Sequence, residues 1–287
     1  MDSPLIEEAR DVICQLPKLS LLSTVIQGHA QFPPVALPKL ISIKIKFESS
    51  FDWLQGFRGA SLGRLEWVCF RSNSTQIGDF LGEFESVALM TSAPDKLSSF
   101  KFLTSHSWNP NYSSLLSFKQ LKELKIEFSC NSGCSSTVDD NIITTLAQAM
   151  PKLETLKLGG APCQTTTGAT VKGLIILASH CPHLSKLRIH FQAVTLADAA
   201  MSAGTTAPPG DGPAVQWEDC VLTDLEVGNA PVTSRASMVA LTLLGIFPHI
   251  SNVKYINSGW ESVAETVKKF RQIHALVHRG GEVHCCA

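Results

Sequence analysis

Several features of secreted, membrane-spanning and disulfide-bonded proteins are missing from this sequence. The opening, MDSPLIEEAR, carries acidic side chains where a secretory leader needs a basic end and an apolar run. The longest stretch of mostly apolar residues, 238–247, is too short to span a bilayer. The 9 cysteines are odd in number and, without a leader, do not indicate a disulfide framework. We therefore expect a reduced chain in the cytoplasm or nucleus.

Overall charge and common catalytic motifs are also lacking. The 24 basic and 25 acidic residues leave a net charge of −1, so the composition does not favour nucleic acid or a membrane. G-x-S-x-G, H-E-x-x-H and P-loop motifs are absent, and Cys130 and Cys134 lack the second ligand pair of a zinc site. We predict no catalytic residue, no metal, no cofactor, and neither a nucleic-acid nor a membrane partner.

What the sequence does contain is a repeated apolar pattern, L-x-x-L-x-I or a close variant. Copies recur at intervals of 24 to 38 residues, and a weaker copy begins at Leu19. A competing copy at 84–89 is too close to the one at Leu97, so the register between residues 70 and 97 stays open. The alternation at the end of each copy is typical of a half-buried strand. The copies begin at Leu40, Leu65, Leu97, Leu121, Leu153, Leu184, Leu222 and Ile250.

Segments with a helical period lie between the copies. Residues 138–150, 166–180 and 233–247 place their apolar residues on one side of a helix, and each ends next to a proline that starts the turn into a strand. The first of these helices has Asp139 or Asp140 as its cap, and terminal helices are expected at 3–16 and 260–278. Repeated strand–helix units predict an α/β leucine-rich-repeat solenoid of the ribonuclease-inhibitor type, with a parallel sheet on the concave face and helices on the convex face.

One domain is expected over residues 1–279. The segment 198–217 is rich in Ala, Gly, Pro and Thr and accounts for the longest interval between copies, so we predict a disordered insertion there. Residues 280–287 are predicted to be a flexible tail. Cys181 stands just before a strand and is expected to pack as a small buried hydrophobic residue.

The outward position between the last two apolar residues of each copy is basic in six copies of eight, the exceptions being Cys69 and Glu226. Like charges on neighbouring strands are unfavourable, which suggests that they serve a protein partner with an acidic or phosphorylated segment. The alternative is a solvated face, partly neutralised by Glu123, Glu127 and Asp224. The predicted binding residues are Lys44, Lys101, Lys125, Lys157, Lys186, Arg188 and Lys254.

Four phrases, LAQAMPKLETLKLGG, TTTGATVKGLIILASHCPHLSKLRIHFQ, LTDLEVGNAPV and MVALTLLGIFPHISNVKYI, carry a resemblance. They resemble the C-terminal leucine-rich regions of fungal F-box proteins, especially those of mushroom-forming fungi, over about residues 120–275. The resemblance implies a non-catalytic receptor whose repeats hold a target of a cullin-based ubiquitin ligase. The L-P-x-E-[IL] opening of an F-box is absent, so a cullin adaptor is expected only if an F-box stands upstream. A stand-alone leucine-rich binder or inhibitor, or an enzyme without a motif, are the alternatives.

Overall fold

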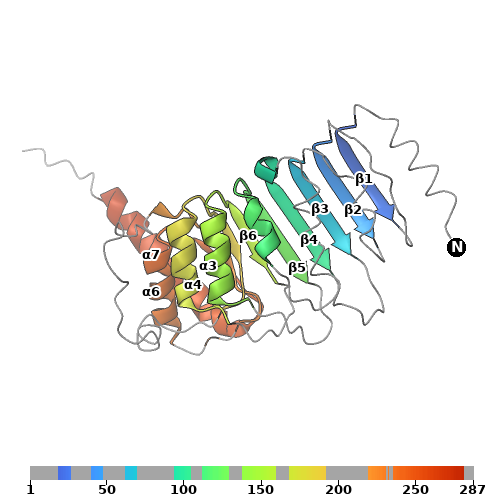
Figure 1. Cartoon of the computed structure of the whole chain (residues 1–287). Helices are drawn as coiled ribbons and strands as arrows, with labels where there is room; N and C mark the ends of the chain where they lie inside the picture. Colours follow the sequence, from blue (N-terminus) through green and yellow to red (C-terminus); the bar gives the residue numbers. More distant parts are fainter. Residues whose placement is uncertain are drawn as a thin grey trace, which may run out of the picture.

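The computed structural model describes residues 19–26, 40–47, 62–69, 94–104, 112–128, 138–159, 168–191, 219–230, 232 and 235–280. The chain has an α/β fold with one 9-stranded parallel sheet, in which the order in space follows the order in sequence (Figure 1). This sequential order without crossovers is compatible with a solenoid. The strands are β1 (Leu21–Ile26), β2 (Ser42–Phe47), β3 (Arg64–Cys69), β4 (Ser99–Thr104), β5 (Glu123–Phe128), β6 (Thr155–Leu158), β7 (Lys186–Arg188), β8 (Asp224–Glu226) and β9 (Asn252–Lys254).

The described helices follow the strands of the C-terminal half, as the sequence predicts. The α-helices are α3 (Asp140–Ala149), α4 (Val171–His180), α6 (Ala236–Ile246) and α7 (Glu261–Gly280), and the short 3-10 helices are η3 (Pro94–Lys96), η4 (Tyr112–Ser117) and η6 (Ser258–Trp260). Helices α3, α4 and α6 end next to a proline, with Met150, Cys181 and Phe247 as their C-caps. The expected helix at 3–16, the competing copy at 84–89, the insertion 198–217 and residues 281–287 of the expected tail lie outside the described residues.

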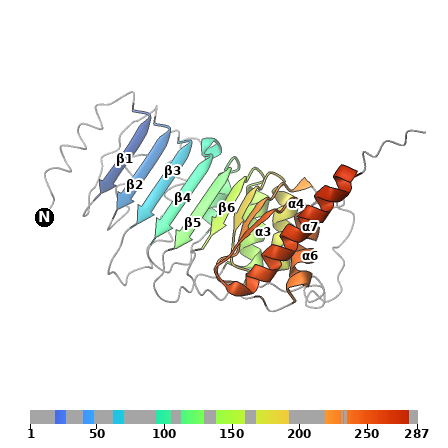
Figure 2. The same ribbon diagram turned by 180° about the vertical axis from the view of Figure 1, so that it is seen from behind.

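Helices α3 and α4 cover one face of the sheet, and the view from behind shows the strands in front of them (Figure 2). We call the face turned away from these helices the open face; it carries Lys44, Lys125, Lys157 and Arg188. Residues alternate between the two faces because successive side chains of a strand point in opposite directions. On β6, for example, Leu156 is fully buried toward the helices while Lys157 is half-buried on the open face.

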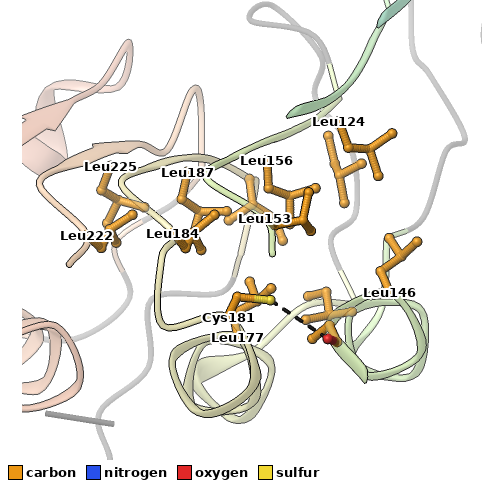
Figure 3. Packing of buried hydrophobic residues seen from close by; sticks show 14 of the residues in the cluster. Leu124, Leu146, Leu153, Leu156, Leu177, Cys181, Leu184, Leu187, Leu222 and Leu225 are labelled. Atoms are coloured by element: carbon orange, nitrogen blue, oxygen red, sulfur yellow. Dashed lines mark hydrogen bonds between the residues drawn. The ribbon is translucent and has the colours of Figure 1, made fainter. Parts of the chain in front are cut away.

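The core is a stack of leucines supplied by successive strands and by the helices that cover them. Figure 3 shows one row of strand leucines and a second row from the residues just before each strand, facing the helix residues Leu146 and Leu177. All of these side chains are buried, so each strand depends on its neighbours for its apolar contacts. The two rows are Leu124, Leu156, Leu187 and Leu225, and Leu153, Leu184 and Leu222.

Cys181 is fully buried in this stack, which confirms its expected role as a core residue. Its thiol Sγ lies 3.6 Å from the carbonyl oxygen of Met150 and 3.8 Å from that of Ala147, at the C-terminal end of α3 (Figure 3). Burial, with a smaller contribution from Cys220, raises the pKa of the Cys181 thiol to about 12. The thiol therefore stays protonated and donates to carbonyl oxygens at the C-terminal end of α3.

One copy of the repeat was assigned to the wrong residues from sequence. The copy predicted at Leu65, Val68 and Phe70 is replaced by one in which Leu62 and Leu65 are the buried positions. Glu66 therefore stands beside Lys44 and Lys101, in the position predicted for Cys69. Two overlapping matches to the pattern occur here, and pairing with both neighbouring strands selects the earlier one. The weaker copy at Leu19 is confirmed as β1, whose Leu22 is buried opposite Ile43.

Two neighbouring aspartates begin α3 but serve different helices. The Asp139 side chain is the N-cap of α3 and accepts a hydrogen bond from the Ile142 backbone N–H at 2.8 Å. The Asp140 carboxylate instead accepts from the backbone N–H groups of Thr170, at 2.8 Å, and Gly173, at 3.1 Å, and from the Thr170 hydroxyl at 2.6 Å. The Asp140 side chain thus satisfies donors at the N-terminus of α4, although Asp140 itself belongs to α3.

Candidate functional site

Backbone pairing brings eight side chains of the open face into one row, which we call the charged row. Parallel strands lie about 4.8 Å apart, so neighbouring members of this row are within reach of one another. Six of the seven predicted binding residues belong to it. The seventh, Lys186, stands on β7 two residues before Arg188, between Thr155 of β6 and Asp224 of β8. The charged row consists of Lys44, Glu66, Lys101, Lys125, Lys157, Arg188, Glu226 and Lys254.

The N-terminal part of the charged row is organised around Glu66. The Lys44 ammonium lies 2.9 Å from Glu66 Oε1, and an Arg64 guanidinium nitrogen lies 3.7 Å from Glu66 Oε2. Burial opposes ionisation of Glu66, but the hydrogen bond and charge of Lys44, with the charges of Lys101 and Arg64, lower its pKa below the usual value. Lys44 and Arg64, which would otherwise repel each other across β2 and β3, are therefore both paired with the Glu66 carboxylate.

Glu123 organises the next part of the open face. Its Oε1 lies 2.5 Å from the Lys125 ammonium, and its Oε2 lies 3.5 Å from the Lys101 ammonium and accepts the Ser99 hydroxyl at 2.5 Å. Burial opposes ionisation, but the hydrogen bonds from Lys125 and Ser99 and the charges of both lysines outweigh it and lower the pKa of Glu123 to about 2. The carboxylate thus stays charged and neutralises part of the row.

Protonating Glu123 should destabilise the fold in acid. Because the folded pKa of about 2 lies below the usual value of 4.5, the stabilisation is complete above pH 4.5 and is lost as the pH falls toward 2. We expect Glu123→Gln to lower the free energy of unfolding by about 1–2 kcal/mol at pH 7, and the difference from the wild type to shrink between pH 4.5 and 2. Urea unfolding at a series of pH values measures this difference.

The control for this titration is Glu154→Gln. Glu154 pairs with Lys122 at 2.7 Å, but both side chains are at least half exposed, so its loss should cost about 0–1 kcal/mol. A difference between wild type and Glu123→Gln that is unchanged from pH 7 to pH 2 would contradict the assigned role of Glu123.

Arg188 holds two carboxylates at once. Its guanidinium lies 3.0 Å from Glu127 on β5 and 2.8 Å from Glu226 on β8, and only 15% of its side chain is exposed. Since β6 separates β5 from β7, the bond to Glu127 passes over β6, where Gly159 follows the strand and has no side chain in the way. Arg188, on β7, therefore links β5 and β8 across the middle of the open face.

Lys157 differs from Lys101, Lys125 and Arg188, the other cations at the centre of the row. It forms no hydrogen bond and no ion pair with any residue of the described part of the chain. Burial lowers the pKa of Lys157, and the positive charges of Arg188 and, more weakly, Lys125 lower it further. The negative charges of Glu127 and Glu226 raise the pKa but do not outweigh these effects. Lys157 is thus a partly desolvated cation at the centre of the charged row, whose other central cations each contact a carboxylate.

Asp224 is the carboxylate around which the polar side chains at the C-terminal part of the open face are arranged. A hydrogen bond from the Asn252 side chain, at 2.8 Å, is the main cause of the lowered pKa of Asp224; burial opposes it, and Thr223 and the charges of Lys254 and Lys186 add to it. Lys186 and Lys254, the two predicted residues at this end, act on Asp224 through their charges, and both remain exposed to solvent.

His190, two residues after Arg188, is buried. Its ring sits next to two glycines that follow β6 and β8, Gly159 with φ +92° and Gly228 with φ +59°. A side-chain Cβ on Gly228 would lie 2.6 Å from ring atoms Cε1 and Nε2 of His190. Both glycines thus supply a left-handed backbone that other residues rarely adopt, and Gly228 also makes room for the ring.

No metal or membrane feature accompanies this surface in the parts of the chain that the structure describes. Among those residues, no group of three or more His, Cys, Asp or Glu side chains is arranged to hold a metal ion. Within the same ranges, no helix is both long and apolar enough to cross a bilayer.

Comparison with models of protein families found no match for this chain, and comparison with curated proteins found none either.

Proposed function

We propose that this chain is a non-catalytic protein-interaction scaffold built from leucine-rich repeats, similar to the substrate-recognition part of an F-box ubiquitin-ligase receptor. The sequential parallel strands, the buried leucine rows and the helices on one face support the repeat assignment. The observation that carries the proposal is the open face, on which backbone pairing holds charged side chains in a fixed register across eight strands.

A surface of this kind suits recognition of a protein. The ion pairs of Glu66, Glu123 and Arg188 fix long side chains that would otherwise lose conformational freedom when a partner binds. Complementary charges across an interface contribute specificity and a fast association rate. Cations outnumber carboxylates along β2 to β9, so an acidic segment is the complementary partner.

Binding to a cullin adaptor is a separate question from target binding. Residues 21–26 and 42–47 form strands of the sheet and not the helical cluster of an F-box. A cullin adaptor would therefore bind through an F-box outside this region, and the open face would hold the target in either case. A stand-alone leucine-rich binder or inhibitor would use the same face without the adaptor.

Paired affinity purification tests the proposed function. One bait is the chain as it stands, and the other carries Lys157→Glu and Lys186→Glu, which reverse two charges of the open face that form no ion pair with the described residues. We expect the second bait to lose a partner set that the first recovers, because an acidic partner then meets repulsion. Lys125 and Arg188 are left unchanged, since reversing Lys125 would release Glu123, and reversing Arg188 would release Glu127 and Glu226.

A matched control bait carries Lys152→Glu and Lys172→Glu, two exposed lysines away from the open face that receive the same change of charge. All baits should first show the same thermal unfolding midpoint. The proposal would be rejected if the control and the open-face variant lost the same partners, or if neither lost any. A cullin adaptor among the partners of the first bait would favour the ligase receptor over the stand-alone binder.

A further inference from the structure

The centre of the open face carries one positive charge more than the carboxylates there can neutralise, and this excess charge is that of Lys157. We propose that Lys157 binds one carboxylate side chain of the protein partner, and that its surroundings disfavour a second acid beside the first. The inference rests on the proposed function of the open face, and it narrows the partner from an acidic segment to a single aspartate or glutamate.

The charge count around Lys157 follows from the ion pairs. On the side of β4 and β5, the two lysines Lys101 and Lys125 face the two carboxylates Glu123 and Glu127, which leaves no net charge. On the side of β7 and β8, Arg188 pairs with Glu226, and the two charges also cancel. The charge of Lys157 is what remains.

The immediate surroundings of Lys157 leave its ammonium available. Its neighbours on the same side of the strand are Thr155 and, beyond the strand end, Gly159, so no long side chain of β6 stands next to it. It is partly removed from water and makes no ion pair with the described residues. A partly buried charge without a partner is unfavourable, and a carboxylate from outside would relieve that cost.

The carboxylates nearby limit what else can bind. A run of acidic residues laid across the strands would meet Glu123 and Glu127 of β5 on one side of Lys157 and Glu226 of β8 on the other. Like charges in contact across an interface repel and disfavour such a partner. A phosphate, which carries nearly two negative charges, would suffer the same repulsion at a site with an excess of one cation. The geometry therefore favours a single carboxylate flanked by neutral or basic residues.

A displayed library of random peptides tests this without knowledge of the natural partner. The full chain is used for selection, and recovered peptides are synthesised and titrated against the wild type, Lys157→Gln and Lys157→Met. We expect a recovered pattern with one acidic position between non-acidic residues, and affinity about tenfold or more lower for both variants. Lys172→Gln, which removes an exposed cation of α4 away from the open face, should change the affinity by less than about twofold.

The outcomes separate this inference from the proposed function. If recovered peptides bind the open-face double variant as well as the wild type, the open face is not the binding surface, and both proposals fail. If they lose affinity for the double variant but carry acidic runs, or bind Lys157→Gln as tightly as the wild type, only the single-carboxylate site is overturned. Phosphoserine in place of the acidic residue should weaken binding, and tighter binding by that peptide would also overturn it.

Discussion

Replacing Leu156 by alanine should lower the free energy of unfolding by about 2–5 kcal/mol. Leu156 is fully buried on β6, in register with Leu124 on one side and Leu187 on the other. Backbone pairing on both sides of β6 keeps the strands from moving together to fill the space that the side chain leaves. Urea unfolding monitored by circular dichroism measures the loss.

The position of Leu156 in the array predicts where the damage appears. Because each strand of this sheet takes its apolar contacts from its neighbours, hydrogen exchange should accelerate most in β5, β6 and β7. The control is Leu241→Ala, at a residue of α6 that is 46% exposed, and it should cost less than about 1 kcal/mol. Equal losses for the two variants would contradict the assigned packing.

The sequence predicts the strands well because each strand needs the same alternation of apolar and polar residues. A buried apolar position recurs beside an outward polar one, and this alternation located β6 and β7 through Leu156 and Leu187. The rule fails at β3, where Leu62 and Leu65 can both start a copy of the pattern. Pairing with β2 and β4 decides between them, and this information lies in other parts of the chain.

The charged row could be predicted as a set of neighbours but not as a network. Sequence spacing places Lys125, Lys157 and Arg188 side by side, and these positions are confirmed by the strand register. Which carboxylate each cation contacts depends on side-chain conformation and on gaps such as that at Gly159, over which Arg188 reaches Glu127. Because the nearby carboxylates pair with other cations, Lys157 forms no ion pair with the described residues, and no sequence motif predicts this.

The two aspartates at the start of α3 give the second large expected effect on stability. Asp140→Ala should lower the free energy of unfolding by about 2–3 kcal/mol, because it leaves two backbone N–H groups and a hydroxyl at the start of α4 without their acceptor. Asp139→Ala removes only the local cap of α3 and should cost about 1 kcal/mol. Urea unfolding of the two variants side by side measures the contrast.

Gly173 provides an independent test of the same contact. A Cβ on Gly173 would lie 2.5 Å from Asp140 Oδ1 and 2.8 Å from the Ile143 side chain, so Gly173→Ala should destabilise the wild type although alanine favours a helix. In the Asp140→Ala background the carboxylate is gone, the flexible end of Ile143 can move aside, and the same substitution should cost less or become stabilising. If Gly173→Ala costs the same in both backgrounds, the two residues are not coupled, and α3 does not hold the N-terminus of α4 through Asp140.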